Sequence, residues 1–160
     1  MNPEILEIEE KKFVGICLTM NLLNDQTPKL WKNFRLLQNH IPHIQNKELV
    51  SLQVYPQNYF SSFDPAANFQ KWALAEVESI NNLPENLNSF IIPAGLYAVF
   101  HYRGSSATAN DFFRYIFTEW MPNSKYELDD RPHFEVLGEK YKNNDPASEE
   151  EVFIPIKIKP

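Results

Sequence analysis

The chain has 160 residues, of which 43% are hydrophobic, 14% aromatic and 22% charged, so it can bury the core of one domain and is not intrinsically disordered. Its formal charge is -6 and neither end carries a basic arm, so we expect no direct binding to DNA or RNA. The chain has one cysteine, an acidic N-terminal stretch unlike a signal peptide, and no apolar run of roughly 18 residues. We therefore expect a cytoplasmic protein without disulfides or membrane spans.

The first half of the chain carries the pattern of two strands, a helix and two further strands. Residues 4–9 and 12–20 are rich in β-branched and aromatic types and predict strands, and residues 49–55 and 69–78 predict the next two. Between these pairs, residues 28–41 have helical periodicity. The helix is indicated by an N-cap, a proline at its first position and a set of apolar residues at helical spacing: Thr27, Pro28, Leu30, Trp31, Phe34, Leu37 and Ile41.

Apart from the lead strand at residues 4–9, the second half repeats this order of elements. A strand is predicted over residues 90–102, interrupted near Pro93 and Gly95, and a helix over residues 108–121. The apolar face of that helix consists of aromatic and aliphatic residues: Phe112, Phe113, Ile116, Phe117 and Trp120. Two strands follow, over residues 132–139 and 151–158. Each half is therefore expected to cover one apolar sheet face with its helix.

Two short sequence features recur at a nearly constant separation. Asp64-Pro65-Ala66 in the first half corresponds to Asp145-Pro146-Ala147 in the second, and the helix-ending Pro42 corresponds to Pro122. A constant separation of like elements is the pattern of an internal repeat.

We therefore expect a single α+β domain over residues 1–160, built as a pseudo-twofold duplication of a strand-helix-strand-strand unit. Its repeats would be residues 1–80 and 81–160, with antiparallel sheets and two main helices that frame a central cleft. The seam between two such units is where a binding groove is expected.

The sequence contains no P-loop, dinucleotide fingerprint, nucleophile elbow or zinc-type spacing, and so it predicts no cofactor and no metal site. His40 and His43 have a spacing compatible with a metal, but solvated histidines at a helix end are the commoner case. Cys17 lies in an apolar strand and is expected to be buried and unreactive.

Glu135 is the candidate functional carboxylate. In its strand, Phe134 and Val136 share one face, which we expect to lie beneath a helix, whereas Glu135 shares the other face with His133 and Leu137. In a water-poor groove, Glu135 would need to be protonated, hydrogen-bonded or matched by a cationic ligand. The alternative is a carboxylate on a wet sheet surface or paired with Lys or Arg.

Aligning the two halves places aromatic side chains beside this carboxylate. Trp72 corresponds to Phe153, Gln53 to Glu135, and Tyr55 to Leu137. The predicted ligand-binding residues are therefore Glu135, Trp72, Tyr55 and Phe153, because aromatic rings around a carboxylate suit flat, apolar or cationic molecules. For each aromatic residue alone, core packing is the alternative. The connector aromatics would form a lid or pack on the flank of the groove: Tyr59, Phe60 and Phe63.

Several segments together give the chain a family resemblance. They are Ile92–Phe100, Trp120–Pro122, Tyr126–Leu128, Pro132–Val136, Asp145–Pro146 and Phe153–Lys157. With these segments the chain resembles the GyrI-like small-molecule-binding domains, which also occur as effector-binding halves of AraC-type and MerR-type regulators. The resemblance implies a duplicated α+β domain with a cleft, in which Glu135 is the acidic determinant for ligands. It also implies a stand-alone member, since the DNA-binding region of such regulators has no counterpart in this sequence.

The expected function is cytoplasmic binding of a hydrophobic small molecule, including cationic and aromatic ones, in a sensing, sequestering or resistance-related role. Two alternatives stay open. The first is a small hydrolase in which Glu135 acts as general base to a water molecule. The second is a protein that docks on a larger partner such as gyrase without ligand chemistry. The sequence does not decide between enzyme and binding protein.

Overall fold

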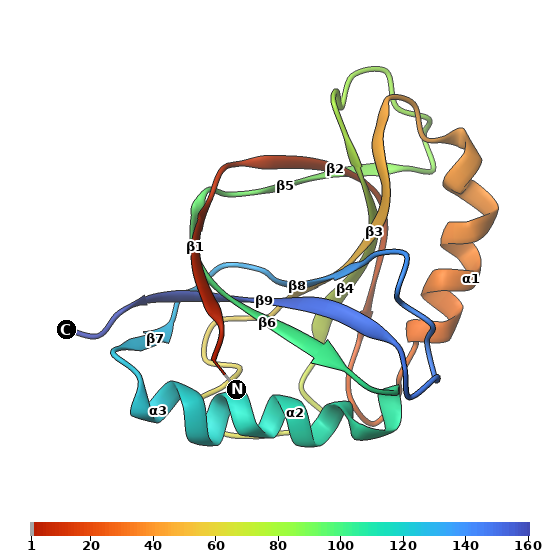
Figure 1. Cartoon of the computed structure of the whole chain (residues 1–160). Coiled ribbons are helices and arrows are strands. Elements are labelled where there is room, and N and C mark those ends of the chain that lie inside the picture. Colours follow the sequence, from red (N-terminus) through yellow and green to blue (C-terminus); the bar gives the residue numbers. More distant parts are fainter. Residues whose placement is uncertain (1) are drawn as a thin grey trace.

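The computed structural model describes residues 2–160 and shows an α+β fold in which helices lie outside a curled antiparallel sheet (Figure 1). The strands are β1 (Glu4–Ile8), β2 (Lys11–Met20), β3 (Ile44–Val54), β4 (Phe69–Val77), β5 (Asn88–Ile92), β6 (Gly95–Arg103), β7 (Tyr126–Leu128), β8 (His133–Leu137) and β9 (Glu149–Ile158). All strands predicted from the sequence are present, and β7 is an additional short strand that pairs with β9.

The sheet curls until its two ends meet. Its strand order is β1-β6-β9-β8-β3-β4-β2-β5. The pairing of β1 with β6 ends at Ile8 and Gly95, and the pairing of β2 with β5 begins at Lys11 and Ile92 without a change of register. Because β1 leads into β2 and β5 leads into β6, these two bent strands join the ends of the sheet into the ring seen in Figure 1. The sheet therefore has an enclosed inner face and an outer face.

The two halves of the chain have the same strand order within the sheet. In the first half the order is β2-β4-β3, in the second it is β6-β9-β8, and the halves meet where β3 pairs with β8. Ser51 pairs with Glu135 in the middle of this contact. The matching order is what an internal duplication requires, and the duplication itself stays a prediction that superposition of residues 1–80 and 81–160 would test.

The two predicted helices are present, with different ends. α1 spans Thr27–Leu37 and continues as the 3-10 turn η1 (Gln38–His40). Thr27 is the first helical residue rather than the cap, and its backbone N–H donates to the Asp25 carboxylate at 2.9 Å. The second helix is a continuous run of η2 (Ser106–Thr108), α2 (Ala109–Tyr115), the π-helical segment η3 (Ile116–Trp120) and α3 (Met121–Asn123).

Each helix covers one side of the outer face. Leu30 and Phe34 of α1 are buried in a cluster with apolar residues of β2 and β4. The aromatic and aliphatic face of the second helix packs in the same way on β6 and β9, where Phe112 and Ile116 are buried. The helices therefore leave the outer face of β3 and β8, in the middle of the sheet, without a helix above it.

The inner face of the ring forms a separate apolar core. Its buried members come from both halves of the chain: Ile8, Phe13, Val50, Leu52, Trp72, Leu74, Ile92, Tyr97 and Phe134. Phe134 and Val136 therefore do not lie beneath a helix, and that prediction was wrong. Closure of the sheet is the reason, because it gives the strands a second apolar face that packs against itself.

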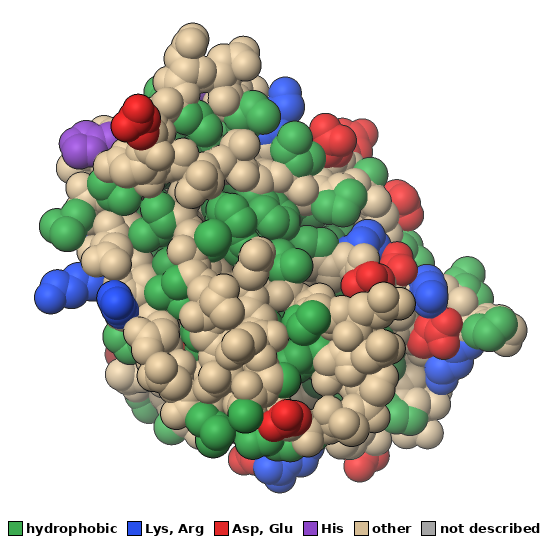
Figure 2. Space-filling model, turned by 180° about the vertical axis from the view of Figure 1, so that it is seen from behind, with side chains coloured by type: hydrophobic (Ala, Val, Ile, Leu, Met, Phe, Trp, Pro, Cys, Tyr) green, Lys and Arg blue, Asp and Glu red, His purple; other side chains and the backbone are tan. Residues whose placement is uncertain are grey.

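Cys17 is exposed, which corrects the expectation that it is buried. Its neighbours Ile16 and Leu18 pack against the cluster under α1, so Cys17 points to the opposite face of β2. Partial burial still raises the pKa of its thiol, which disfavours the reactive thiolate. Elsewhere on the surface, hydrophobic side chains gather in the middle of the face shown in Figure 2, with charged side chains toward its margins.

Candidate functional site

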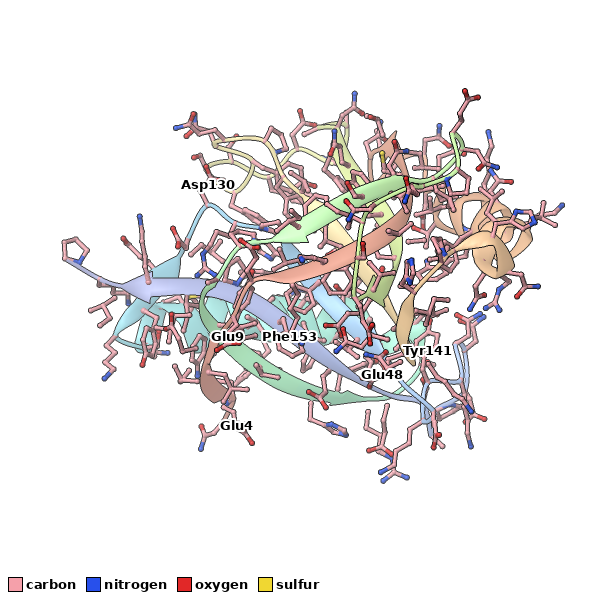
Figure 3. All side chains as sticks on the ribbon, turned by 90° about the horizontal axis from the view of Figure 1, so that it is seen from above. Glu4, Glu9, Glu48, Asp130, Tyr141 and Phe153 are labelled. Atoms are coloured by element: carbon pink, nitrogen blue, oxygen red, sulfur yellow. The ribbon has the colours of Figure 1, made fainter. Side chains whose placement is uncertain are left out.

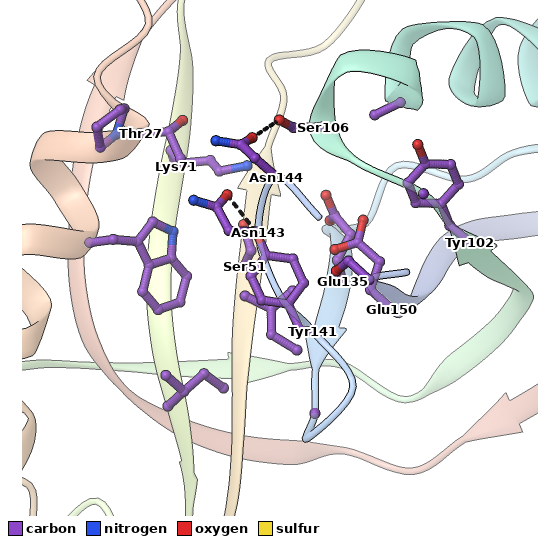
Figure 4. Close-up of a pocket in the computed structure, with 18 of the residues that line it drawn as sticks. Thr27, Ser51, Lys71, Tyr102, Ser106, Glu135, Tyr141, Asn143, Asn144 and Glu150 are labelled. Atoms are coloured by element: carbon purple, nitrogen blue, oxygen red, sulfur yellow. Dashed lines mark hydrogen bonds between the residues drawn. The ribbon is translucent and has the colours of Figure 1, made fainter. Parts of the chain in front are cut away.

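A groove of about 660 Å³ lies over the middle of the outer sheet face, between α1 and the second helix (Figure 4). Ser51 of β3 and Glu135 of β8, which pair across the two strands, form part of its floor. Trp31 of α1 and Phe113 of α2 contribute aromatic walls, and Tyr141 reaches it from the loop between β8 and β9. The groove exists because the helices cover β2–β4 and β6–β9 but leave the central strands open.

An aromatic cluster lies beside His133, which neighbours Glu135 on the same face of β8. Phe60 stacks on the His133 ring at 5.4 Å and on Phe117 of η3 at 5.4 Å. Tyr55 packs edge-on against His133 at 4.9 Å and contacts Tyr59 at 4.6 Å. The connector after β3 is thus packed against the second helix through Phe60 and Phe117. Tyr59 and Phe60 do not line the groove, so of the two alternatives for the connector, this packing favours the one without a lid. Phe63 is 79% exposed and takes no part.

Burial keeps His133 uncharged. Its ring is buried among the aromatic side chains, and loss of solvent lowers its pKa to about 3. A cationic imidazole would lose its hydration there without gaining a carboxylate partner. His133 therefore acts as a neutral ring that packs between Tyr55 and Phe60.

Glu135 is half-buried in the floor of the groove, where it contacts an amide and lies near a lysine. Burial raises the pKa of its carboxyl group, whereas nearby Lys71 and a hydrogen bond from Gln53 act in the opposite direction. With the Gln53 amide oriented so that its nitrogen faces Glu135, the nitrogen donates to Oε2 at 3.1 Å and the oxygen accepts from Lys71 Nζ. The expected proximity of Gln53 and Glu135 at the seam is confirmed by this contact.

A second carboxylate, Glu150 of β9, lines the same groove (Figure 4). Burial and the neighbouring charge of Glu135 raise the pKa of Glu150 to about 7, with Lys71 opposing the shift. With this value, both the protonated and the ionised form of Glu150 are populated near neutral pH. Two carboxylates and one lysine together can neutralise a positively charged ligand, and protonated Glu150 can release its proton when the ligand binds.

Of the four residues predicted to bind a ligand, the structure brings Glu135 to this groove and places the other three elsewhere. Trp72 and Phe153 lie on the inner face of the ring, where Phe153 stacks on Phe134 at 4.4 Å. Phe153 and the groove residue Tyr141 lie apart in the view of Figure 3. Tyr55 belongs to the aromatic cluster. The three aromatic residues therefore form no box around Glu135, and ligand contact by any of the four stays a prediction.

The sequence-based site omitted Glu150, Lys71, Trp31, Phe113 and Tyr141, all of which line the groove. The signal for Glu150 was its spacing of two residues from Val152, which places both side chains on one face of β9. Because Val152 pairs with Glu135, Glu150 becomes a diagonal neighbour of that carboxylate. The pairing of β8 with β9, however, cannot be read from the sequence pattern alone.

The chain matches the GyrI-like small-molecule-binding domain over residues 1–157, and it belongs to this family. It is similar to the transcriptional regulator BrlR of Pseudomonas aeruginosa, with 26% identity over 157 residues that make up 98% of this chain and 56% of the regulator. The chain thus spans about half the length of this curated relative.

Two solved structures have the same fold. One is SAV2435 bound to tetraphenylphosphonium, with a TM-score of 0.71, 13% identity and coverage of 98% of this chain and 94% of that chain. The other is the C-terminal domain of EcmrR, with a TM-score of 0.73, 12% identity and coverage of 98% and 97%.

Two further observations concern metals and membranes. Within residues 2–160, no group of three or more His, Cys, Asp or Glu side chains is placed to hold a metal ion. In the same part of the chain, no helix has the length and apolar character needed to cross a membrane.

Proposed function

We propose that the groove between the two halves binds lipophilic organic cations. The observation that carries this proposal is the pair of half-buried carboxylates, Glu135 and Glu150, which face one groove that also holds Lys71. Desolvated like charges are unfavourable in the empty groove, so a cation that enters relieves their repulsion. A lipophilic cation is favoured over a strongly hydrated one because it loses little hydration on entry.

The aromatic lining supports the same ligand class. Trp31, Phe113 and Tyr141 bring ring surfaces to the groove from α1, α2 and the β8–β9 loop. Ring faces attract cations and supply apolar contact area with little loss of rotamer freedom. A groove of about 660 Å³ lies within the range of sites that hold drug-sized molecules.

The comparisons support a ligand-binding role. The family is defined by small-molecule binding, and the similar protein SAV2435 was solved with tetraphenylphosphonium, a lipophilic cation. The similarity to a transcriptional regulator is consistent with a sensor. We therefore propose that this protein captures such cations in the cytoplasm, as a sensor, as a sequestering protein or as an accessory to resistance.

Calorimetric titration with tetraphenylphosphonium tests the proposal. Glu135→Gln keeps the shape of the side chain and removes its charge, and we expect the affinity to fall about ten- to a hundredfold. Glu151→Gln is the matched control, because it removes the same charge from an exposed residue next to Glu150 on β9. Its effect on affinity should be less than about twofold, as expected for a screened surface charge.

Two results would count against this function. Equal affinity of the wild type and the Glu135→Gln variant would mean that the carboxylate does not recognise the cation. Turnover of ester substrates that disappears in the same variant would instead favour the hydrolase alternative, in which Glu135 activates water.

A further inference from the structure

Lys71 is a positively charged residue within a groove that we propose to bind cations. It lies on β4, its side chain is half-buried, and it pairs across the strands with Gln53 of β3. Gln53 in turn pairs with His133 of β8, next to the position of Glu135 on the same face. Lys71 therefore faces the same groove as Glu135, which lies two strands away across β3 (Figure 4).

The Gln53 amide separates this lysine from the carboxylate. Its oxygen accepts from Lys71 Nζ while its nitrogen donates to Glu135. No ion pair within 4.0 Å joins Lys71 to a carboxylate among residues 2–160. Both Glu135 and Glu150 nevertheless experience the charge of Lys71. Lys71 therefore partly neutralises the carboxylates without forming a direct ion pair with either, and both carboxylates line the groove.

We propose that Lys71 is a specificity-determining residue that restricts the groove to singly charged cations and disfavours dications. This inference rests on the proposed function and deepens it. With both carboxylates ionised, Glu135, Glu150 and Lys71 together carry one negative unit, which one positive charge on a ligand neutralises. The other charged side chains that line the groove, Asp25, Arg35 and Lys47, are exposed, and water and salt screen them. Among the half-buried groups, a second positive charge would find no further counter-charge and would be repelled by the lysine.

The dependence on ligand charge gives the inference a quantitative form. The Coulomb energy between Lys71 and a ligand is proportional to the ligand charge. Removing the lysine charge should therefore leave the affinity for a neutral ligand unchanged, raise that for a monocation about tenfold, and raise that for a matched dication about a hundredfold. The logarithm of the gain should increase in proportion to the charge.

Three biaryl probes of similar shape make this comparison: 4-methylbiphenyl, 1-methyl-4-phenylpyridinium and 1,1′-dimethyl-4,4′-bipyridinium. Their affinities would be measured by calorimetry for the wild type and for Lys71→Met, which keeps the length of the side chain. Titration at about pH 8.5 lies above the pKa of Glu150, which is about 7, and keeps that carboxylate charged in the wild type.

Two further variants separate charge from structure. Lys71→Arg keeps the charge, so it should retain the wild-type preference for the monocation. Arg35→Met removes a positive charge from an exposed residue of α1 that also lines the groove, and its smaller, screened effect should be less than about threefold for either cation. Thermal unfolding confirms that each variant is folded before titration.

The outcomes distinguish this inference from the proposed function. If the wild type binds the monocation but Lys71→Met leaves the ratio of dication to monocation affinity unchanged, the inference is wrong and the proposed function stands. If Lys71→Met raises the affinity for all three probes equally, the residue acts through the shape of the groove, and the inference is also wrong. If no variant binds either cation, the proposed function fails and the inference fails with it.

Discussion

Acidification below about pH 6.5 is expected to destabilise the folded protein through His133, whose ring is buried beside Phe60 and Phe117. Burial lowers its pKa from the ordinary value of 6.5 to about 3 in the folded state. Between these two values the unfolded chain binds a proton at this residue and the folded chain does not. Stability is therefore complete above pH 6.5 and decreases as the pH falls toward 3.

The size of the effect follows from the difference between the two pKa values. Each unit corresponds to about 1.4 kcal/mol, so the full difference lowers the free energy of unfolding by roughly 5 kcal/mol, of which about half is lost by pH 4.5 to 5. Glu150 acts with the opposite sign. Its raised pKa of about 7 means that the folded state binds the proton more tightly than the unfolded chain does, so its contribution to the free energy of unfolding increases as the pH falls through 7.

Urea unfolding at several pH values between about 4.5 and 7.5 measures the net dependence. Comparing the wild type with His133→Phe isolates the histidine, because the variant keeps an aromatic ring that does not titrate while the Glu150 contribution is common to both proteins. His40→Phe is the control, since this histidine is exposed. Identical slopes for the wild type and His133→Phe below pH 6.5 would refute the reasoning; only His133→Phe should flatten the loss in acid.

Two further predictions concern packing. A Cβ atom at Gly15 would lie 1.9 Å from the Ala73 carbonyl oxygen, so Gly15→Ala should lower the free energy of unfolding in urea by about 3 kcal/mol or more. Gly138→Ala is the control. Its Cβ atom would lie 3.2 Å from the flexible Glu48 side chain, so this variant should change stability little. Phe60→Ala should remove the stacking on His133 and lower stability by about 1–2 kcal/mol. The same change at the exposed Phe63 should have almost no effect. Equal effects of the two variants in thermal unfolding would contradict a packing role for this connector.

The elements of the fold were predictable because their signals are local. Alternating and helical apolar patterns located the strands and both helices, and Pro42 and Pro122 lie close to the ends of those helices. The interruption at Pro93 is also present, as the junction between β5 and β6. The three-residue strand β7 was missed, because three residues span less than one helical turn and only about one and a half periods of strand alternation, which is too short to identify a pattern.

The candidate site was only partly predictable. Glu135 was selected because a carboxylate in an otherwise apolar strand requires a partner, and the correspondence of the halves brought Gln53 to it. The aromatic residues were misplaced relative to it because alternation assigns a side chain to one of two faces without saying which face is enclosed. Trp72 and Phe153 lie on the inner face, and Trp31 and Tyr141 reach the groove from a helix and a loop.

The sequence by itself determined the kind and order of the elements, the membership of Glu135 in one strand face, and the family resemblance, because each depends on residues that are close in the chain. Only the tertiary structure decided that the sheet closes on itself, that the helices leave β3 and β8 open, and that Glu150 and Lys71 lie near Glu135. These arrangements depend on strand register between distant segments. A shift of one residue in the pairing of β8 with β9 would turn Glu150 to the other face, so the charge of the groove is set by long-range pairing.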